Sequence, residues 1–150
     1  LRVGQPLLVH THFNHPRECT PEAARCLRRL ADAGFSTANQ MVLLRGVNDN
    51  AATVREVNHW LLRQRCRPYY LFQADLAQGV SHFRTPLATG LAILKALRGH
   101  TSGMAVPHYV VDAPGGGGKV PLVPQYVHEQ QNGRLLFENY LGELYEYPLE

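Results

Sequence analysis

The sequence has few of the features that mark secreted, membrane-spanning or metal-binding proteins. Its 150 residues include three cysteines, and Cys19, Cys26 and Cys66 show no CxxC or CxxxCxxC spacing, which excludes metal motifs of that kind. An odd number of cysteines without a framework is typical of reduced thiols, so we expect a cytoplasmic protein. No apolar run is long enough to span a membrane, and there is no signal peptide, so we expect no membrane partner.

Charge of one sign is also scarce. The net charge is +3, and the basic residues are spread along the chain. The longest basic cluster, residues 63–67, lies at the end of a predicted helix, where cations interact favourably with the helix dipole. We therefore expect no nucleic-acid partner. With 45% hydrophobic and 18% charged residues, the composition is typical of a globular protein.

Short apolar runs alternate with helical patterns along most of the chain. Strands are predicted at residues 6–13, 39–44, 69–73 and 106–111. Capping residues and prolines predict helices that begin near Thr20-Pro21, after Asn48-Asp49-Asn50 and near Thr85-Pro86. Cys26 falls within the apolar pattern of the first helix, so we expect it in the core. The strand–helix order predicts an α/β fold with a parallel sheet and right-handed crossovers.

The composition changes after residue 119. Residues 120–150 are rich in Tyr, Leu and Val and contain two turn signals, Asn132-Gly133 and Leu141-Gly142. Asn-Gly between apolar runs is a strong hairpin signal. We therefore expect an α/β unit over residues 1–119 and a C-terminal β-hairpin extension over residues 120–150.

Four glycines and a lysine, residues 115–119, follow the last predicted strand. Such a run costs much backbone entropy and is tolerated where the chain bends sharply or approaches another group closely. The amine of Lys119 can form a Schiff base with an aldehyde cofactor or neutralise a phosphate. A flexible loop with a solvated lysine is the alternative. A nucleotide-binding P-loop does not fit, because Ala113 and Val120 occupy the places of its first glycine and its Ser or Thr.

Polar residues follow the predicted strands at their carboxyl ends, where parallel sheets bind ligands. His12 follows the first strand, Asp75 the third and Asp112 the fourth, and Lys119 comes shortly afterwards. We expect these four side chains to share one edge of the sheet, where they can bind a zwitterion with a positively charged tail. Each residue alone also has a structural interpretation, as a helix cap, a strand-end residue or a buried histidine.

Six segments of the sequence resemble the lysine 2,3-aminomutase family. They occur in the family's order and cover most of residues 8–126: THFNHP (11–16), NQMVLLRGVND (39–49), RPYY (67–70), HFRTP (82–86), LRGHTSG (97–103) and VDAPGGGGK (111–119). The family consists of radical S-adenosylmethionine enzymes that also use pyridoxal phosphate and a [4Fe–4S] cluster. The resemblance implies an isomerase that converts L-lysine to L-β-lysine, and the C-terminal half of a partial TIM-like (β/α) barrel.

The resemblance also implies roles for particular residues. Lys119 corresponds to the Schiff-base lysine that binds pyridoxal phosphate. Asp75 and Asp112 correspond to the pair that binds the substrate's ε-ammonium group, and His12 and Gln40 to contacts with S-adenosylmethionine. The implied partners are a small amino-acid substrate and other copies of the protein in a homo-oligomer.

The sequence departs from the family pattern in several places. It lacks the CxxxCxxC motif, so the ligands of the iron–sulfur cluster are expected outside this chain and no metal ligand within it. The arginines for the substrate carboxylate and the cofactor phosphate are also missing, Asn50 stands where a zinc-binding cysteine often occurs, and Phe72 replaces a common tyrosine. We therefore expect a chain that begins within a domain and is inactive alone. The alternatives are an aminomutase for arginine or glutamate, an enzyme that supplies β-lysine for elongation factor P, and a non-catalytic half-barrel module.

Overall fold

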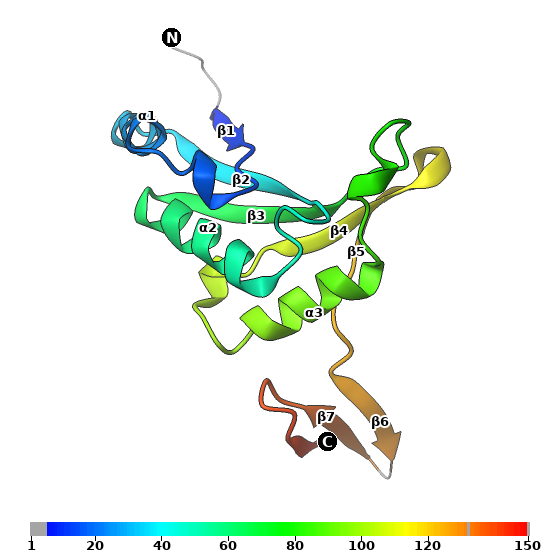
Figure 1. Ribbon diagram of the computed structural model, residues 1–150. Coiled ribbons are helices and arrows are strands. Elements are labelled where there is room, and N and C mark those ends of the chain that lie inside the picture. Colours follow the sequence, from blue (N-terminus) through cyan, green and yellow to red (C-terminus); the bar gives the residue numbers. More distant parts are fainter. Residues whose placement is uncertain (1–5, 132, 150) are drawn as a thin grey trace.

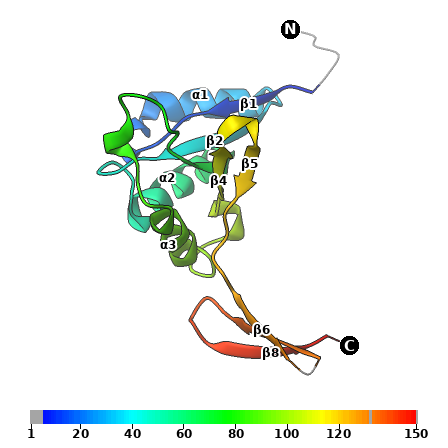
Figure 2. The same ribbon diagram turned by 90° about the vertical axis from the view of Figure 1, so that its right-hand side faces the viewer.

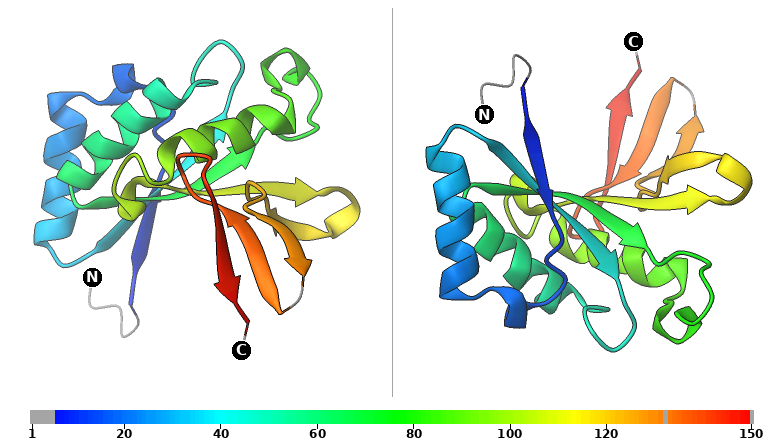
Figure 3. Two further views of the ribbon diagram at one scale, coloured as in Figure 1. Left: turned by 90° about the horizontal axis from the view of Figure 1, so that it is seen from below. Right: turned by 90° about the horizontal axis from the view of Figure 1, so that it is seen from above.

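The described part of the chain contains two β-sheets and three α-helices (Figure 1). The computed structural model describes residues 6–131 and 133–149, and only the backbone of residues 129–131. The larger sheet has the strand order β1-β2-β3-β4-β5, and the smaller one β6-β7-β8. All three helices lie on one face of the larger sheet (Figure 1). No α-helix of the described residues lies on the opposite face, which we call the open face (Figure 3).

The larger unit follows the alternation that the sequence predicts: β1 (Leu8–Thr11), α1 (Pro21–Asp32), β2 (Ser36–Leu43), α2 (Ala51–Arg63), β3 (Cys66–Gln73), α3 (Leu87–Leu97), β4 (His108–Ala113) and β5 (Gly118–Pro121). Strands β1 to β4 pair in parallel, which confirms the predicted parallel sheet. Strand β5 is the exception, since it pairs antiparallel to β4. It brings the chain back beside β4, at the edge of the sheet.

Two helices begin at the predicted caps and one does not. Thr20 caps α1 by accepting a hydrogen bond from the Ala23 amide, and Asn50 caps α2. In α3, Pro86 takes the N-cap position that the sequence assigned to Thr85. The Thr85 hydroxyl instead lies 3.4 Å from Gln73 Oε1, so a contact with the neighbouring strand replaces the cap.

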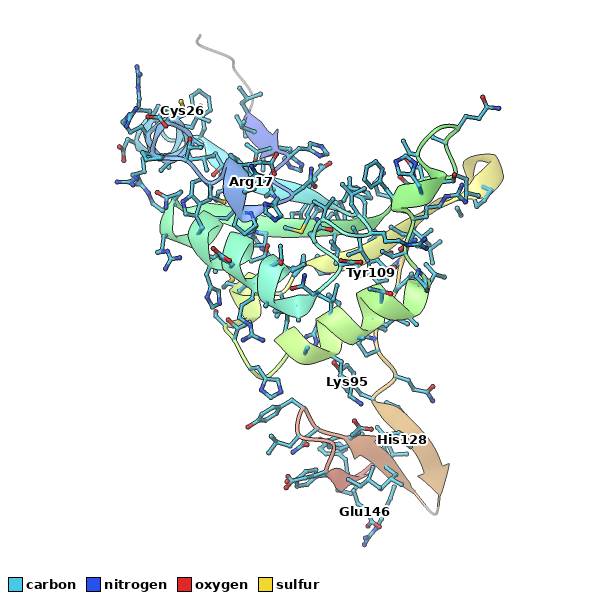
Figure 4. The ribbon with its side chains drawn as sticks, viewed as in Figure 1. Arg17, Cys26, Lys95, Tyr109, His128 and Glu146 are labelled. Carbon is cyan, nitrogen blue, oxygen red and sulfur yellow. The ribbon has the colours of Figure 1, made fainter. Side chains whose placement is uncertain are left out.

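The core fills the space between the sheet and the helices. Its members are side chains from β2, β3 and β4 and from all three α-helices: Leu27, Met41, Leu43, Val54, Val57, Leu61, Cys66, Leu71, Ile93, Leu94, Leu97 and Tyr109. Tyr109 lies on this side of the sheet, facing α3 (Figure 4). A Cβ atom on Gly90 would be 2.2 Å from Tyr109 Cζ, so α3 packs directly on the tyrosine ring. The Tyr109 hydroxyl donates to Gln73 Oε1 at 2.5 Å, and burial raises its pKa to about 12.

The expectation that Cys26 lies in the core was wrong. Cys26 is exposed on the outer side of α1 (Figure 4). The buried side of the helix runs through Ala24 and Leu27. Cys26 directly precedes Leu27, and consecutive helical residues are about 100° apart around the axis, so its side chain points away from the sheet.

The smaller sheet is antiparallel and contains β6 (Val127–Gln131), β7 (Arg134–Glu138) and β8 (Leu144–Pro148). It has one strand more than the predicted hairpin, because the turn at Leu141-Gly142 leads into β8. Gly142 has a φ of 83° there, and its amide donates to the Asn139 carbonyl. In the other predicted turn, Asn132 lies outside the described residues.

The smaller sheet contacts α3 and the turn that follows it. Glu138 on β7 pairs with Lys95 on α3 and lies 3.1 Å from His128 Nε2. Tyr140 packs over Gly99, with its ring centroid 5.2 Å from that of His100. The smaller sheet therefore lies beyond α3, on the side away from β1 (Figures 1 and 2).

Candidate active site

The open face of the larger sheet carries the candidate site. Figure 3 (right) looks onto this face, with α2 and α3 behind the strands. Along β2, Thr37, Asn39, Met41 and Leu43 are buried on the helix side, and the alternate residues are more exposed. Gln40 therefore lies on the open face, in register with Tyr70 on β3, which is in register with His108 on β4.

A glycine turn places Lys119 beside Asp112. Gly115, Gly116 and Gly118 have φ values of 69°, 81° and 77°, which glycine adopts without strain. The turn reverses the chain into β5, so that Asp112 and Lys119 become cross-strand partners. Lys119 Nζ lies 3.2 Å from Asp112 Oδ1. The run of glycines thus forms the sharp bend that the sequence predicted, and Lys119 lies in a strand rather than in a loop.

The Lys119 amine is held but accessible. Its Nζ lies 5.3 Å from the ring centroid of Phe72, within the range of a cation–π contact. The side chain is 47% exposed and that of Asp112 is 41% exposed. A primary amine that is oriented by a carboxylate and an aromatic ring, and that solvent can reach, can condense with an aldehyde group.

Gln40 and His12 lie apart from Lys119. Gln40 is in the middle of β2, not at the strand start that the sequence predicted, and its Nε2 is 2.5 Å from Nδ1 of His10 on β1. His12 is exposed directly after β1. Of the five predicted site residues, the structure joins only Asp112 and Lys119 by a direct contact in the part of the chain that it describes.

Three asparagines that sequence reasoning missed hold the segment around His12. Asn39 Oδ1 accepts from the Phe13 amide at 2.7 Å, and Asn39 Nδ2 donates to the Phe13 carbonyl at 3.0 Å. Asn14 Oδ1 accepts from the Val42 amide, and buried Asn48 donates to the Asn14 carbonyl. These bonds fix the carboxyl end of β1 against β2. The position of His12 is therefore set before any ligand binds.

Asp75 lies in the segment between β3 and α3. It is exposed, and among the ion pairs of the described residues none involves it. Gln73 Nε2 donates to the Thr85 carbonyl at 2.7 Å and closes the base of this segment. Asp75 and Asp112 belong to the carboxyl ends of neighbouring strands, as the sequence predicted.

A β-bulge adds two tyrosines to the open face. Asn39 pairs with Pro68 and Gln40 with Tyr70, which leaves Tyr69 as an extra residue on β3. The centroids of the Tyr69 and Tyr70 rings are 3.9 Å apart, and the two hydroxyl groups share a hydrogen bond of 3.0 Å. This bond raises the pKa of Tyr70, and partial burial and the charges of Tyr69 and Asp112 raise it further. The available signal was Pro68, because a proline within a strand is typical of a bulge.

The described residues do not fit an iron–sulfur cluster. Cys19, Cys26 and Cys66 lie in different elements, and no three His, Cys, Asp or Glu side chains of the described residues are grouped to hold a metal ion. Burial raises the pKa of Cys66 and, with the charges of Glu18 and Glu56, raises that of Cys19 to about 11. Cysteine ligands must be thiolates, so these thiols are poorly suited to bind iron. In the described part of the chain, no helix is long and apolar enough to cross a membrane.

Comparison with known proteins identifies the family. The family model for lysine-2,3-aminomutase matches residues 94–149. An L-lysine 2,3-aminomutase from Fusobacterium nucleatum is 51% identical over 147 residues, which cover 98% of this chain and 35% of that protein. The chain belongs to the lysine 2,3-aminomutase family. It corresponds to the C-terminal portion of these larger relatives and spans about a third of their length.

Other members of the aminomutase family differ in the amino acid that they are named for. An L-lysine 2,3-aminomutase from Clostridium subterminale is 49% identical over 147 aligned residues, which make up 98% of this chain and 35% of that protein. A glutamate 2,3-aminomutase from Clostridioides difficile is 43% identical over 144 aligned residues, which make up 96% of this chain and 34% of that protein. The relatives thus share the aminomutase class and differ in the amino acid that their names give.

Proposed function

We propose that this chain is part of an enzyme that converts L-lysine to L-β-lysine with S-adenosylmethionine, pyridoxal phosphate and a [4Fe–4S] cluster. The observation that carries the proposal is the accessible Lys119 amine, held 3.2 Å from Asp112 at the carboxyl end of β4. The cofactors supply the radical and carbonyl chemistry, and the protein supplies position and charge. The cluster ligands belong outside this chain, because its cysteines do not fit them.

Lys119 binds the aldehyde of pyridoxal phosphate in this proposal. Asp112, which lies beside Lys119, would supply one carboxylate for the substrate's ε-ammonium. Asp75, from the neighbouring strand end, supplies a second carboxylate. Two carboxylates close together favour a cationic ligand, because a negative charge beside them would be repelled. This arrangement favours lysine over glutamate.

His12 and Gln40 contact S-adenosylmethionine in this proposal, at the β1–β2 side of the open face. We propose further that β1 to β4 are part of a larger (β/α) barrel whose interior is lined by that face. The three α-helices of the described residues lie on the other face of the sheet, as helices do in a barrel (Figure 3). We also propose that the protein forms a homo-oligomer, as its family resemblance implies.

The test of the proposed function is chemical labelling of Lys119 in the complete protein. Pyridoxal phosphate is added, the imine is reduced with borohydride, and the labelled peptide is identified by mass spectrometry. We expect the label on Lys119 and its loss in Lys119→Ala. Lys95, the other lysine of this chain, is the internal control because it pairs with Glu138 beyond the helices. A label on Lys95 instead of Lys119 would contradict the proposed role.

Substrate choice is tested separately. Anaerobically reconstituted protein is incubated with lysine, arginine or glutamate, and the products are resolved by chromatography. We expect β-lysine to be the main product. Efficient turnover of glutamate would show that Asp75 and Asp112 do not select the substrate.

A further inference from the structure

The open face carries a row of aromatic rings that joins the two groups of predicted site residues. The Tyr69 and Tyr70 pair lies at its centre. The ring centroid of His10 is 5.6 Å from that of Tyr69, and the ring centroid of Phe72 is 5.2 Å from that of Tyr70. His108 on β4 completes the row, 6.4 Å from Tyr70. We call these five residues the aromatic row.

The two ends of the aromatic row meet predicted ligand-binding residues. At one end, Nδ1 of His10 lies 2.5 Å from Nε2 of Gln40. At the other end, Phe72 lies beneath the amine of Lys119, which is paired with Asp112. A ligand attached to Lys119 therefore begins next to the row, and one held by Gln40 lies over its opposite end.

The aromatic row differs from the core on the other side of the sheet. The core residues of β2 to β4 are largely apolar, and the Tyr109 hydroxyl is satisfied by Gln73 within it. Tyr69 and Tyr70 are only partly buried, and His10 and His108 are exposed. In the proposed barrel this face would be covered, and its hydroxyl and imidazole groups would then need hydrogen-bond partners. A purely apolar group lying on the face would leave these polar atoms unsatisfied. A planar ligand with ring nitrogens and attached polar groups would satisfy both the ring faces and these polar atoms.

We propose that the aromatic row is a stacking platform for the planar heteroaromatic ring of a small-molecule ligand, with the Tyr69 and Tyr70 pair at its centre. This inference rests on the proposed function, in which two ligands carry such a ring: pyridoxal phosphate, with a pyridine, and S-adenosylmethionine, with an adenine. The β3 bulge is the device that builds the platform, since it places two consecutive tyrosines on the same face.

The test measures equilibrium binding of both ligands to the complete protein. Pyridoxal phosphate is titrated by absorbance and S-adenosylmethionine by calorimetry, with Tyr70→Leu, Tyr69→Leu and Tyr70→Phe. Stacking contacts of this kind are lost with the ring, so we expect either leucine variant to weaken one ligand by about tenfold. Tyr70→Phe keeps the ring and should bind within about twofold of the wild type. Tyr147→Leu, an exposed tyrosine on β8, is the matched control and should change neither affinity.

The two ligands distinguish the source of the ring. Loss of pyridoxal phosphate affinity assigns the platform to the pyridine, and loss of S-adenosylmethionine affinity assigns it to the adenine. Unchanged affinities in both leucine variants, folded by circular dichroism, would overturn the platform while leaving Lys119 labelling intact. Equal losses in Tyr70→Phe and Tyr70→Leu would also overturn it, since the hydroxyl rather than the ring would then carry binding. If the wild type binds neither ligand and Lys119 takes no label, the proposed function itself fails.

Discussion

Replacing Asp112 with asparagine separates the stability of this site from its function. The substitution keeps the shape of the side chain and removes the charge that faces Lys119 Nζ at 3.2 Å. Both side chains are nearly half exposed, and exposed ion pairs contribute about 0.2–1 kcal/mol because water screens them. The free energy of unfolding should therefore fall by less than about 1 kcal/mol.

The effect on turnover should be larger. If Asp112 binds the substrate's ammonium, the variant loses a charge-assisted hydrogen bond of about 1.5–3 kcal/mol. Since 1.4 kcal/mol corresponds to a factor of ten, the kcat/KM for lysine should fall at least about tenfold. The two quantities are measured by urea denaturation and by steady-state formation of β-lysine, on the same preparation of the complete protein.

Asp32→Asn is the matched control. Asp32 also pairs with a cation, Arg65, at an exposed site, and the substitution makes the same change of charge at the end of α1. It should leave lysine kinetics unchanged. The reasoning would be refuted if Asp112→Asn turned over lysine normally, or if it lost activity only in proportion to unfolded protein.

Three further results are expected. Asp75→Asn should leave the denaturation midpoint unchanged, because Asp75 is exposed, and lower the kcat/KM for lysine at least about tenfold; normal kinetics would exclude it from substrate binding. Gly90→Ala should destabilise the protein by about 1–3 kcal/mol in urea denaturation, because the added methyl group would lie 2.2 Å from the Tyr109 ring; an unchanged midpoint would show that the ring can move. The hydrogen bond from Lys95 lowers the pKa of Glu138 in the folded protein. The pair therefore stabilises the fold at any pH above the pKa that the carboxyl has in the unfolded chain, and this stabilisation is lost as the pH falls through the lower folded pKa. The protection factors of the β7 amides, which correct for the intrinsic pH dependence of exchange, should fall on acidification, and Lys95→Ala should remove most of that fall.

Local patterns were enough to predict the order of strands and helices in the larger unit. Apolar runs and helix caps are local features, and the carboxyl ends of parallel strands meet at one edge whatever the loops do. The starts of β2 and β3 were misplaced because polar residues lie inside these strands. Thr37 and Asn39 are buried because both have distant backbone partners. The Thr37 hydroxyl donates to the Arg65 carbonyl, and the Asn39 side chain accepts from the Phe13 amide and donates to the Phe13 carbonyl. Partners so far away along the chain leave no local signal.

The candidate site was predicted less completely than the fold. The positions of Asp112 and Lys119 followed from the strand end and the glycine run, but their pairing depends on the direction of β5. That strand has four exposed residues, including a glycine and a proline, and no apolar alternation to reveal it. The aromatic row was hidden for a related reason, because alternation assigns Tyr69 and Tyr70 to opposite faces unless a bulge intervenes.

The bulge in β3 also restricts how this segment can change during evolution. Tyr69 is the residue that the pairing with β2 skips, so loss of one residue there would remove the bulge and leave the later residues of β3 in the same register with β2. The strand would keep its core residues, but the open face would carry one tyrosine in place of the Tyr69 and Tyr70 pair. Single-residue insertions and deletions should therefore be rare at this point among active relatives, and common in the connection at residues 122–126. A gap in this strand would thus mark a relative that has lost the site while keeping the fold.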